Sequence, residues 1–184
     1  MQVIKTPLDG LLEIIPTVYF DDRGWFFEFY KESEFLKHGI TTKFVQENQS
    51  FTKKGIVRGL HYQSPPHAQA KLVSIGSGKV LDVVVDMRRD SKTFRQVYTC
   101  ILDGSRHNMM LVPEGFAHGF AALEDSIFIY KCSDEYHPDL EKGIVWNDPS
   151  LAIDWQIKDP IVSAKDKVLP TMEEFLRKSV ISPQ

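Results

Sequence analysis

Closely spaced strand patterns occupy most of the chain and limit what it can fold into. Ten short runs rich in β-branched and aromatic residues are separated by Gly, Pro, Asp and Asn. Strands this short and this close together are typical of sandwiches and barrels, so the sequence predicts an all-β fold. The predicted strands are residues 11–15, 25–29, 43–51, 56–62, 71–75, 80–86, 97–102, 109–112, 119–123 and 126–132.

The segments between these strands predict turns, two short helices and an arm. Gly76 and Gly78 in "IGSGKV" predict a tight hairpin, and "DGSRHN" (103–108) predicts a turn joining the next pair. Helical patterns are confined to two peripheral segments, 31–39 and 171–179, and the second opens with a Thr cap and a Glu three residues later. The prolines and weak periodicity of 146–170 predict a long ordered arm lying on a surface.

Length and charge restrict the partners. A chain of 184 residues without a break in composition predicts one domain, 1–184, which buries about 70% of its unfolded surface. The net charge of −3 gives no overall attraction for nucleic acid or anionic lipid, so an anionic ligand needs a local basic cluster. We find no signal-peptide pattern and no apolar run long enough for a membrane span, so we expect a cytoplasmic protein without a membrane partner. Cys100 and Cys132, the only cysteines, predict reduced thiols.

Two histidines lie in strand contexts that point to a cavity. His61 is in "VRGLHYQSP" (57–65), and His118 follows a turn in "PEGFAHGF" (113–120). A double-sheet jelly roll has an interior that holds small ligands, and both imidazoles can face it. Arg58 and His61 fall on opposite faces of a regular strand because their spacing is odd, so we predict an irregularity at Gly59.

The same histidines do not match a metal site. A metal-binding cupin places two histidines as His-x-His with a nearby Glu, whereas position 59 is Gly and no second histidine completes a triad around His61. We therefore expect no metal. The remaining histidines lie among charged or turn residues and are predicted to be solvated; they are His38, His67, His107 and His137.

Seven ordered motifs resemble the dTDP-4-dehydrorhamnose 3,5-epimerase family, in register from about residue 3 to 170. They are "FDDRGWFFE" (20–28), "VQENQS" (45–50), "GIVRGLHYQSPPHAQAKLV" (55–73), "VLDVVVDMRRDSKTF" (80–94), "VPEGFAHGFAAL" (112–123), "YKCSDEYHPDLEKGIVWNDP" (130–149) and "SAKDK" (163–167). The resemblance implies a cupin-type jelly roll, a homodimer, no cofactor and a 4-keto-6-deoxy sugar substrate attached to dTDP.

The matched motifs also imply residue roles. His61 falls where the family has its catalytic base, Asp166 at its dyad partner and Tyr130 at its general acid. The positions matching contacts to the sugar or phosphates are Arg58, Lys71 and His118. Other substrate-contacting positions, some serving the neighbouring subunit, are Arg23, Glu28, Gln46, Asn48, Glu141 and Lys165, and Phe26 and Tyr136 match rings near the nucleobase.

Elementary chemistry agrees with these roles. Removing a proton next to a ketone needs a base within reach and a group that stabilises the enolate oxygen. An imidazole oriented by a carboxylate suits the first task, so His61 and Asp166 form a suitable pair. Lys71 offers an ammonium for the enolate, and Tyr130 offers a proton from the opposite face.

The resemblance thus implies an epimerase that needs no cofactor and inverts C3 and C5 of the sugar. Three other functions stay open on the sequence. The first is an epimerase of the same fold that acts on one carbon or on another nucleotide sugar. The second is a non-catalytic sugar-nucleotide-binding jelly roll, and the third is a metal-dependent cupin oxygenase. Two departures from the family pattern, Ala70 and the "DWQ" of 154–156, leave the proposed catalytic groups untouched.

Overall fold

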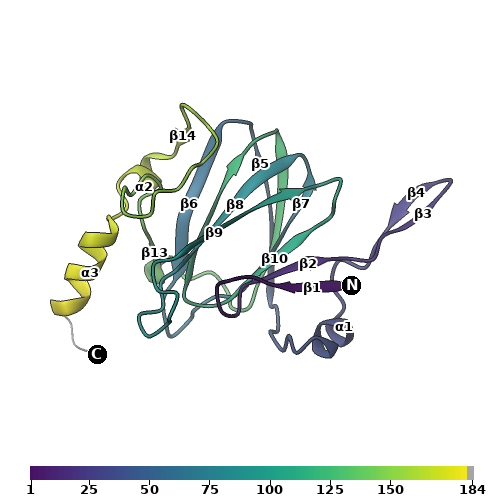
Figure 1. The fold of residues 1–184 in the computed structure, drawn as a ribbon, viewed down its shortest axis with the longest axis horizontal. Coiled ribbons are helices and arrows are strands. Elements are labelled where there is room, and N and C mark those ends of the chain that lie inside the picture. Colours follow the sequence, from purple (N-terminus) through teal and green to yellow (C-terminus); the bar gives the residue numbers. More distant parts are fainter. Residues whose placement is uncertain (182–184) are drawn as a thin grey trace.

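Two facing β-sheets form the body of the protein in a computed structural model that describes residues 1–181 (Figure 1). The first sheet has the strand order β1 (Gln2–Lys5), β2 (Leu12–Ile15), β10 (Met109–Val112), β7 (Lys71–Ser77), β12 (Ser126–Cys132) and β5 (Gln46–Thr52). The second has the order β13 (Glu141–Gly143), β6 (Ile56–Gln63), β11 (Phe116–Ala122), β8 (Lys79–Asp86) and β9 (Val97–Asp103). Pairing within both is antiparallel, and β14 (Ile161–Val162) joins β6 in parallel.

This arrangement confirms the predicted all-β, cupin-type jelly roll. Apolar residues of both sheets pack between them, among them Val73 and Phe128 of the first sheet and Val84 and Phe120 of the second. A second apolar cluster covers the outer face of the second sheet, and a third covers the outer face of the first. One end of the space between the sheets stays less filled, and the site described below lies there.

Glycine turns occur where they were predicted, but the prediction that the strands flanking each turn pair with each other was wrong. β7 and β8 belong to different sheets, so the chain between them crosses from one layer to the other instead of closing a hairpin. The chain from β9 to β10 crosses in the same way. Gly78 has a φ of 82°, and a Cβ there would lie 2.2 Å from the Asp125 carbonyl oxygen. Glycine fixes where the chain reverses, but strand pairing depends on which faces can be buried together.

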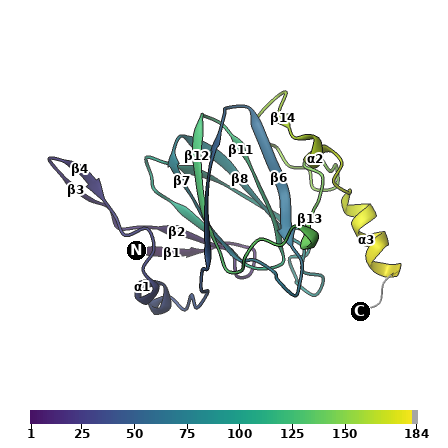
Figure 2. The same cartoon turned by 180° about the vertical axis from the view of Figure 1, so that it is seen from behind.

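The peripheral elements agree with the sequence in part. α1 (Glu32–Lys37) and α3 (Met172–Ile181) occur where helices are predicted, and Thr171 and Glu174 cap α3 reciprocally. The prediction omitted β1, β13, β14 and a short helix, α2 (Ala164–Lys167). The predicted strand 25–29 is shorter, because β3 (Tyr19–Asp21) and β4 (Gly24–Phe26) form a small hairpin that projects away from the body (Figures 1 and 2).

The predicted arm lies along the second sheet. Leu151 and Trp155 are buried in the same apolar cluster as Val57 and Leu60 of β6, and the Trp155 indole donates a hydrogen bond to the Trp146 carbonyl at 2.8 Å. The arm then pairs with β6 through β14 and leads directly into α2. Its packing therefore determines where the residues of α2 lie relative to β6.

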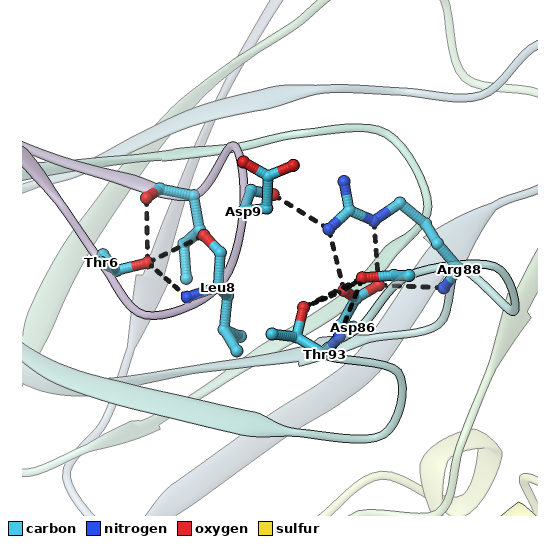
Figure 3. Close-up of polar contacts among 8 residues, drawn as sticks. Thr6, Leu8, Asp9, Asp86, Arg88 and Thr93 are labelled. Atoms are coloured by element: carbon cyan, nitrogen blue, oxygen red, sulfur yellow. Dashed lines mark hydrogen bonds and ion pairs between the residues drawn. The ribbon is translucent and has the colours of Figure 1, made fainter.

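A buried carboxylate anchors the end of β8 (Figure 3). Asp86 is fully buried and accepts hydrogen bonds from the Arg88 guanidinium, the Ser91 hydroxyl and the Thr93 hydroxyl. Burial alone opposes ionisation, but these hydrogen bonds outweigh it and lower the pKa of Asp86 to about 2. Arg88 also donates to the Asp9 carbonyl, so the cluster ties the β8–β9 connection to the loop before β2.

Candidate active site

A cavity of about 540 Å³ opens between the two sheets near β6 and the arm. A second cavity of about 310 Å³ adjoins it, and both are lined by His61, Lys71 and Tyr130. His61 comes from the second sheet, whereas Lys71 and Tyr130 come from the first. These three side chains therefore line one site from two opposing walls.

His61 and Asp166 form a hydrogen-bonded pair at this site. The His61 Nε2 atom lies 2.8 Å from Oδ1 of Asp166, which is buried, while about a quarter of the His61 side chain is exposed. The other Asp166 oxygen accepts the Gly59 N–H at 3.2 Å. Burial opposes ionisation of Asp166, but the hydrogen bonds from His61 and Gly59 outweigh it and leave the pKa below its ordinary value. An anionic Asp166 orients the imidazole and stabilises its protonated form.

Local sequence explains how α2 presents Asp166. Ser163 caps the helix, and its hydroxyl accepts the Asp166 N–H at 3.0 Å. Because the arm pairs with β6 just before this cap, the carboxylate is held over the strand that carries His61. The arm thus brings together His61 and Asp166, which are 105 positions apart in the sequence.

The predicted irregularity at Gly59 is confirmed. Gly59 has a φ of 121°, and the pairing of β6 with β11 shifts register between His118 and Phe120, opposite this glycine. A Cβ at Gly59 would lie 2.6 Å from the Gly119 Cα, so a side chain does not fit. The shift allows Arg58 and His61 to line the same cavity despite their odd spacing.

Lys71 and Tyr130 lie on the facing wall in environments that alter their acidity. Burial is the main cause that lowers the pKa of the Lys71 ammonium. Burial also raises the pKa of the Tyr130 phenol, which keeps it protonated at neutral pH. The wall opposite His61 therefore carries an amine and a phenol, both largely shielded from water.

His118 is the second histidine that reaches the cavity, and it is paired with an acid that the sequence analysis missed. Its Nε2 atom lies 2.7 Å from Oδ1 of Asp82, and both side chains are buried. Within residues 1–181, Asp82 Oδ2 is a buried oxygen without a hydrogen-bond partner. Asp82 precedes Asp86 by four positions on a strand of valines, and a buried acid in such a run is a signal that sequence reasoning can use.

Most other predicted substrate-contacting residues also reach the site. Glu141 accepts hydrogen bonds from Lys165 and from the Tyr136 hydroxyl, and the Tyr136 N–H donates to Gln46 Oε1 at 2.9 Å. The second cavity is lined by Gln46, Asn48, Tyr136 and Glu141, and the first by Arg58 and Lys165. Lining residues not predicted from the sequence include Phe120 and Phe128, whose rings stack 4.2 Å apart, Ser50 and Ile161.

Three predicted residues do not join this site within one chain. Arg23 and Phe26 are on the projecting β3–β4 hairpin, where Arg23 pairs with Asp21, and Glu28 pairs with Lys31 nearby. None of the three lines either cavity. The sequence prediction allowed for this outcome at Arg23 and Glu28, because it assigned part of their set to a neighbouring subunit's site, but it made no such allowance for Phe26.

The prediction that four histidines are solvated was partly wrong. His107 is buried, with its ring 4.2 Å from the Trp25 ring and 4.9 Å from the Phe27 ring. His67 and His137 are half-buried and stack on each other with ring centroids 3.9 Å apart. The prediction took turn residues to face water. Instead, Trp25 and Phe27 cover His107, and His67 and His137 stack on each other where two loops meet. His38 is exposed, as predicted.

Comparison with known proteins decides the family. The family model for dTDP-4-dehydrorhamnose 3,5-epimerase matches residues 5–174. The chain belongs to this family. Its members are isomerases, and the family assignment confirms the resemblance seen in the motifs.

Relatives match along almost the whole chain. The dTDP-4-dehydrorhamnose 3,5-epimerase of Escherichia coli is 41% identical over 186 residues, which cover 99% of this chain and 100% of the relative. A Legionella pneumophila epimerase solved in complex with dTDP-4-keto-L-rhamnose is 43% identical with a TM-score of 0.90, covering 94% of this chain and 93% of the other. A 3'-monoepimerase from Streptomyces bikiniensis, in complex with dTDP-quinovose, is 31% identical with a TM-score of 0.88, covering 96% and 91%.

Two further sequence predictions concern the rest of the molecule. Both cysteines are free, as expected from their spacing. Within the described residues, every helix is too short or too polar to cross a membrane.

Proposed function

We propose that the protein inverts C3 and C5 of dTDP-4-dehydro-6-deoxy-D-glucose to give dTDP-4-dehydro-L-rhamnose, a step of dTDP-L-rhamnose biosynthesis. One observation carries the proposal: the His61–Asp166 pair lies on one wall of the cavity, and Tyr130 lies on the other. Binding alone needs no base with an opposed acid, whereas inversion at carbon needs both.

The first step is proton removal. His61 takes the proton from the carbon next to the 4-keto group, and the electron pair of the broken C–H bond moves to form the enolate at O4. Asp166 stabilises the resulting imidazolium through its 2.8 Å hydrogen bond. Lys71 faces the developing negative charge, and its lowered pKa makes it a better hydrogen-bond donor to the enolate oxygen.

The second step is reprotonation from the other face. Tyr130 gives its phenolic proton to the same carbon, and the electron pair of the enolate forms the new C–H bond. Water then returns a proton to Tyr130 and removes one from His61, so the sugar keeps its composition. Repeating the sequence at the second carbon, which is also adjacent to C4, gives the doubly inverted product.

Substrate binding uses the remaining polar residues. Arg58 and Lys165 supply the local positive charge that the overall charge of −3 cannot, and we assign them to the diphosphate. We assign Tyr136 to the nucleobase, because its ring lines the second cavity and its position is fixed through Glu141 and Gln46.

Incubation with dTDP-4-dehydro-6-deoxy-D-glucose in D2O tests this function. The product is expected to carry deuterium at both C3 and C5, because each new C–H bond takes a proton that has exchanged with solvent. Proton NMR of the recovered sugar nucleotide measures incorporation at each carbon. An enzyme-free incubation is the control for spontaneous exchange.

Each other outcome of that experiment points to a different function. Deuterium at one carbon alone would indicate a single-carbon epimerase, like the 3'-monoepimerase of Streptomyces bikiniensis. Binding of dTDP without incorporation at either carbon would indicate a sugar-nucleotide-binding protein and would refute catalysis.

We also propose that the protein is a homodimer in which each subunit lends its hairpin to the other's site. Tyr19, Phe20, Trp25 and Phe26 are between 55% and 75% exposed on a hairpin that leaves the body, as Figure 2 makes clear. So many exposed aromatic side chains mark an interaction surface. Arg23 lies at the tip of the same hairpin, so a two-fold partner can place its positive charge in the neighbouring cavity.

A mixed dimer distinguishes this arrangement from a self-contained subunit. We expect Arg23→Ala and His61→Asn dimers to be impaired, and a heterodimer of the two, isolated with two affinity tags, to regain about half of wild-type activity. One of its sites combines an intact His61 with Arg23 of the partner subunit, and the other lacks both. If each hairpin serves its own chain, both sites of the heterodimer are defective, and no activity returns.

A further inference from the structure

A second cluster of ionisable side chains lies beside Gln63 and Gln69, two residues that line the second cavity and hydrogen-bond the backbone of the cluster. His67, Asp134 and His137 place one ligand atom each within 4.8 Å of one another, and the proposed mechanism uses none of them. Among the described residues, no other group of three His, Cys, Asp or Glu side chains brings its ligand atoms so close. His67 comes from the β6–β7 loop, and the other two come from the loop after β12.

The spacing within the cluster is close to that of a metal's ligands. The His67 Nδ1 atom lies 2.9 Å from Asp134 Oδ2. Ligand bonds of about 2.0–2.1 Å around a tetrahedral zinc ion place neighbouring ligand atoms roughly 3.3 Å apart. The His67 and His137 rings stack with centroids 3.9 Å apart and 18° between their planes, so both can bind one ion only after one ring turns out of the stack and the His67–Asp134 pair opens.

Hydrogen bonds hold the two loops in position. The buried Gln63 amide donates to the carbonyls of His67 and Glu135, and its oxygen accepts the His137 N–H at 2.8 Å. Gln69 donates to the Asp134 carbonyl at 2.8 Å. The three ligand residues are thus fixed at the backbone, which lowers the entropic cost of bringing them around an ion.

The Asp134 carboxylate is also oriented by hydrogen bonds. Its Oδ1 atom accepts the Glu135 N–H at 2.7 Å, which leaves Oδ2 directed to His67. Outer hydrogen bonds of this kind commonly orient the ligands of protein-bound metals.

We propose that His67, Asp134 and His137 bind a zinc ion, with water as the fourth ligand. Two imidazoles and one carboxylate suit a borderline transition metal such as zinc, whereas magnesium and calcium prefer oxygen ligands throughout. The ion joins the β6–β7 loop to the loop that carries Tyr136, which lines the second cavity. Its role is to hold that wall, and it takes no part in the proton transfers at His61.

Zinc titration of the chelator-treated full chain tests the site. Calorimetry is expected to show one zinc ion per chain. The double variant His67→Ala/His137→Ala is expected to bind it at least about tenfold more weakly, a loss that even changes in a metal's outer shell produce. His38→Ala is the matched control, because His38 is exposed and lies outside the cluster. Its affinity for zinc should equal that of the wild type.

Three results would overturn the proposal. Absence of binding to the wild type would mean that His67 and Asp134 form an ordinary ion pair. Equal affinity in the wild type and the double variant would place any bound zinc elsewhere, and loss of binding in His61→Asn would place it at the His61–Asp166 pair. If circular dichroism shows that the double variant does not fold, His137→Gln, which removes one ligand and keeps the side-chain volume, is titrated in its place with the same criteria.

Discussion

Replacing His61 with Asn is expected to lower turnover of dTDP-4-dehydro-6-deoxy-D-glucose by about 1,000- to 10,000-fold, at the upper end for loss of a positioned base. The Asn side chain fills most of the imidazole's space and can still donate to Asp166, so the fold and the cavity should persist. It cannot accept a proton at neutral pH. Affinity for dTDP is expected to stay close to that of the wild type, because the proposed diphosphate contacts, Arg58 and Lys165, are unchanged.

Turnover is measured by chromatography of the sugar nucleotides, and dTDP binding by calorimetry. His38→Asn is the matched control, because it makes the same substitution at an exposed histidine that lines neither cavity. Near-wild-type turnover in His61→Asn would remove His61 from the role of base. A parallel loss of dTDP binding would instead mean that the substitution disrupts the cavity.

The strands could largely be predicted from the sequence, whereas their pairing could not. Runs rich in β-branched and aromatic residues indicated β6, β8 and β12, because strand propensity is a local property. The connections at Gly76–Gly78 and 103–108 looked like hairpins but cross between sheets. Which strands pair depends on burying both inner faces together, and no local pattern records that requirement. β14, with two residues, is too short to carry a strand pattern at all.

Many residues that line the two cavities could be named from the sequence, whereas their geometry could be predicted only in part. Gly59 was the exception, since the odd spacing of Arg58 and His61 required a break in the strand, and the register shift is there. The distribution of His61 and Tyr130 on opposing walls follows from the sheet order. Asp82 was missed because nothing near it in sequence indicates that it pairs with His118, 36 residues away.

Packing of the arm, rather than any local sequence pattern, explains why Asp166 lies in the cavity wall. Asp166 lies in a polar segment that alone resembles a solvated loop, yet it is buried. The burial of Trp155 and the pairing of β14 with β6 bring that segment over the second sheet. The position of the Asp166 carboxylate thus depends on contacts made earlier in the arm, by Trp155 and β14. In the sequence, only the resemblance to a family indicated that Asp166 lies beside His61.

Tyr130→Phe is expected to separate two events that the wild type couples. His61 can still remove a proton and return one to the same face, so solvent hydrogen should enter the substrate without inversion. The imidazole is partly exposed, which allows its proton to exchange with water before return. Product formation is expected to fall by about 100-fold or more, because the proton from the opposite face is lost. Phenylalanine keeps the ring beside Phe128, with centroids 5.9 Å apart in the wild type, so the cavity wall should hold its shape.

The measurement is the ratio of deuterium in recovered substrate to deuterium in product, by NMR in D2O. Tyr30→Phe is the matched control: Tyr30 packs with the apolar cluster on the outer face of the first sheet and lines neither cavity, so the ratio should not change. A rise in the ratio for Tyr130→Phe alone would assign the opposed proton to Tyr130. Equal losses of exchange and product would contradict that assignment, because they would make Tyr130 necessary for enolate formation itself. Because Tyr130 faces His61 from the opposite wall, removing its phenolic hydroxyl should suppress inversion while leaving hydrogen exchange at the substrate carbon intact.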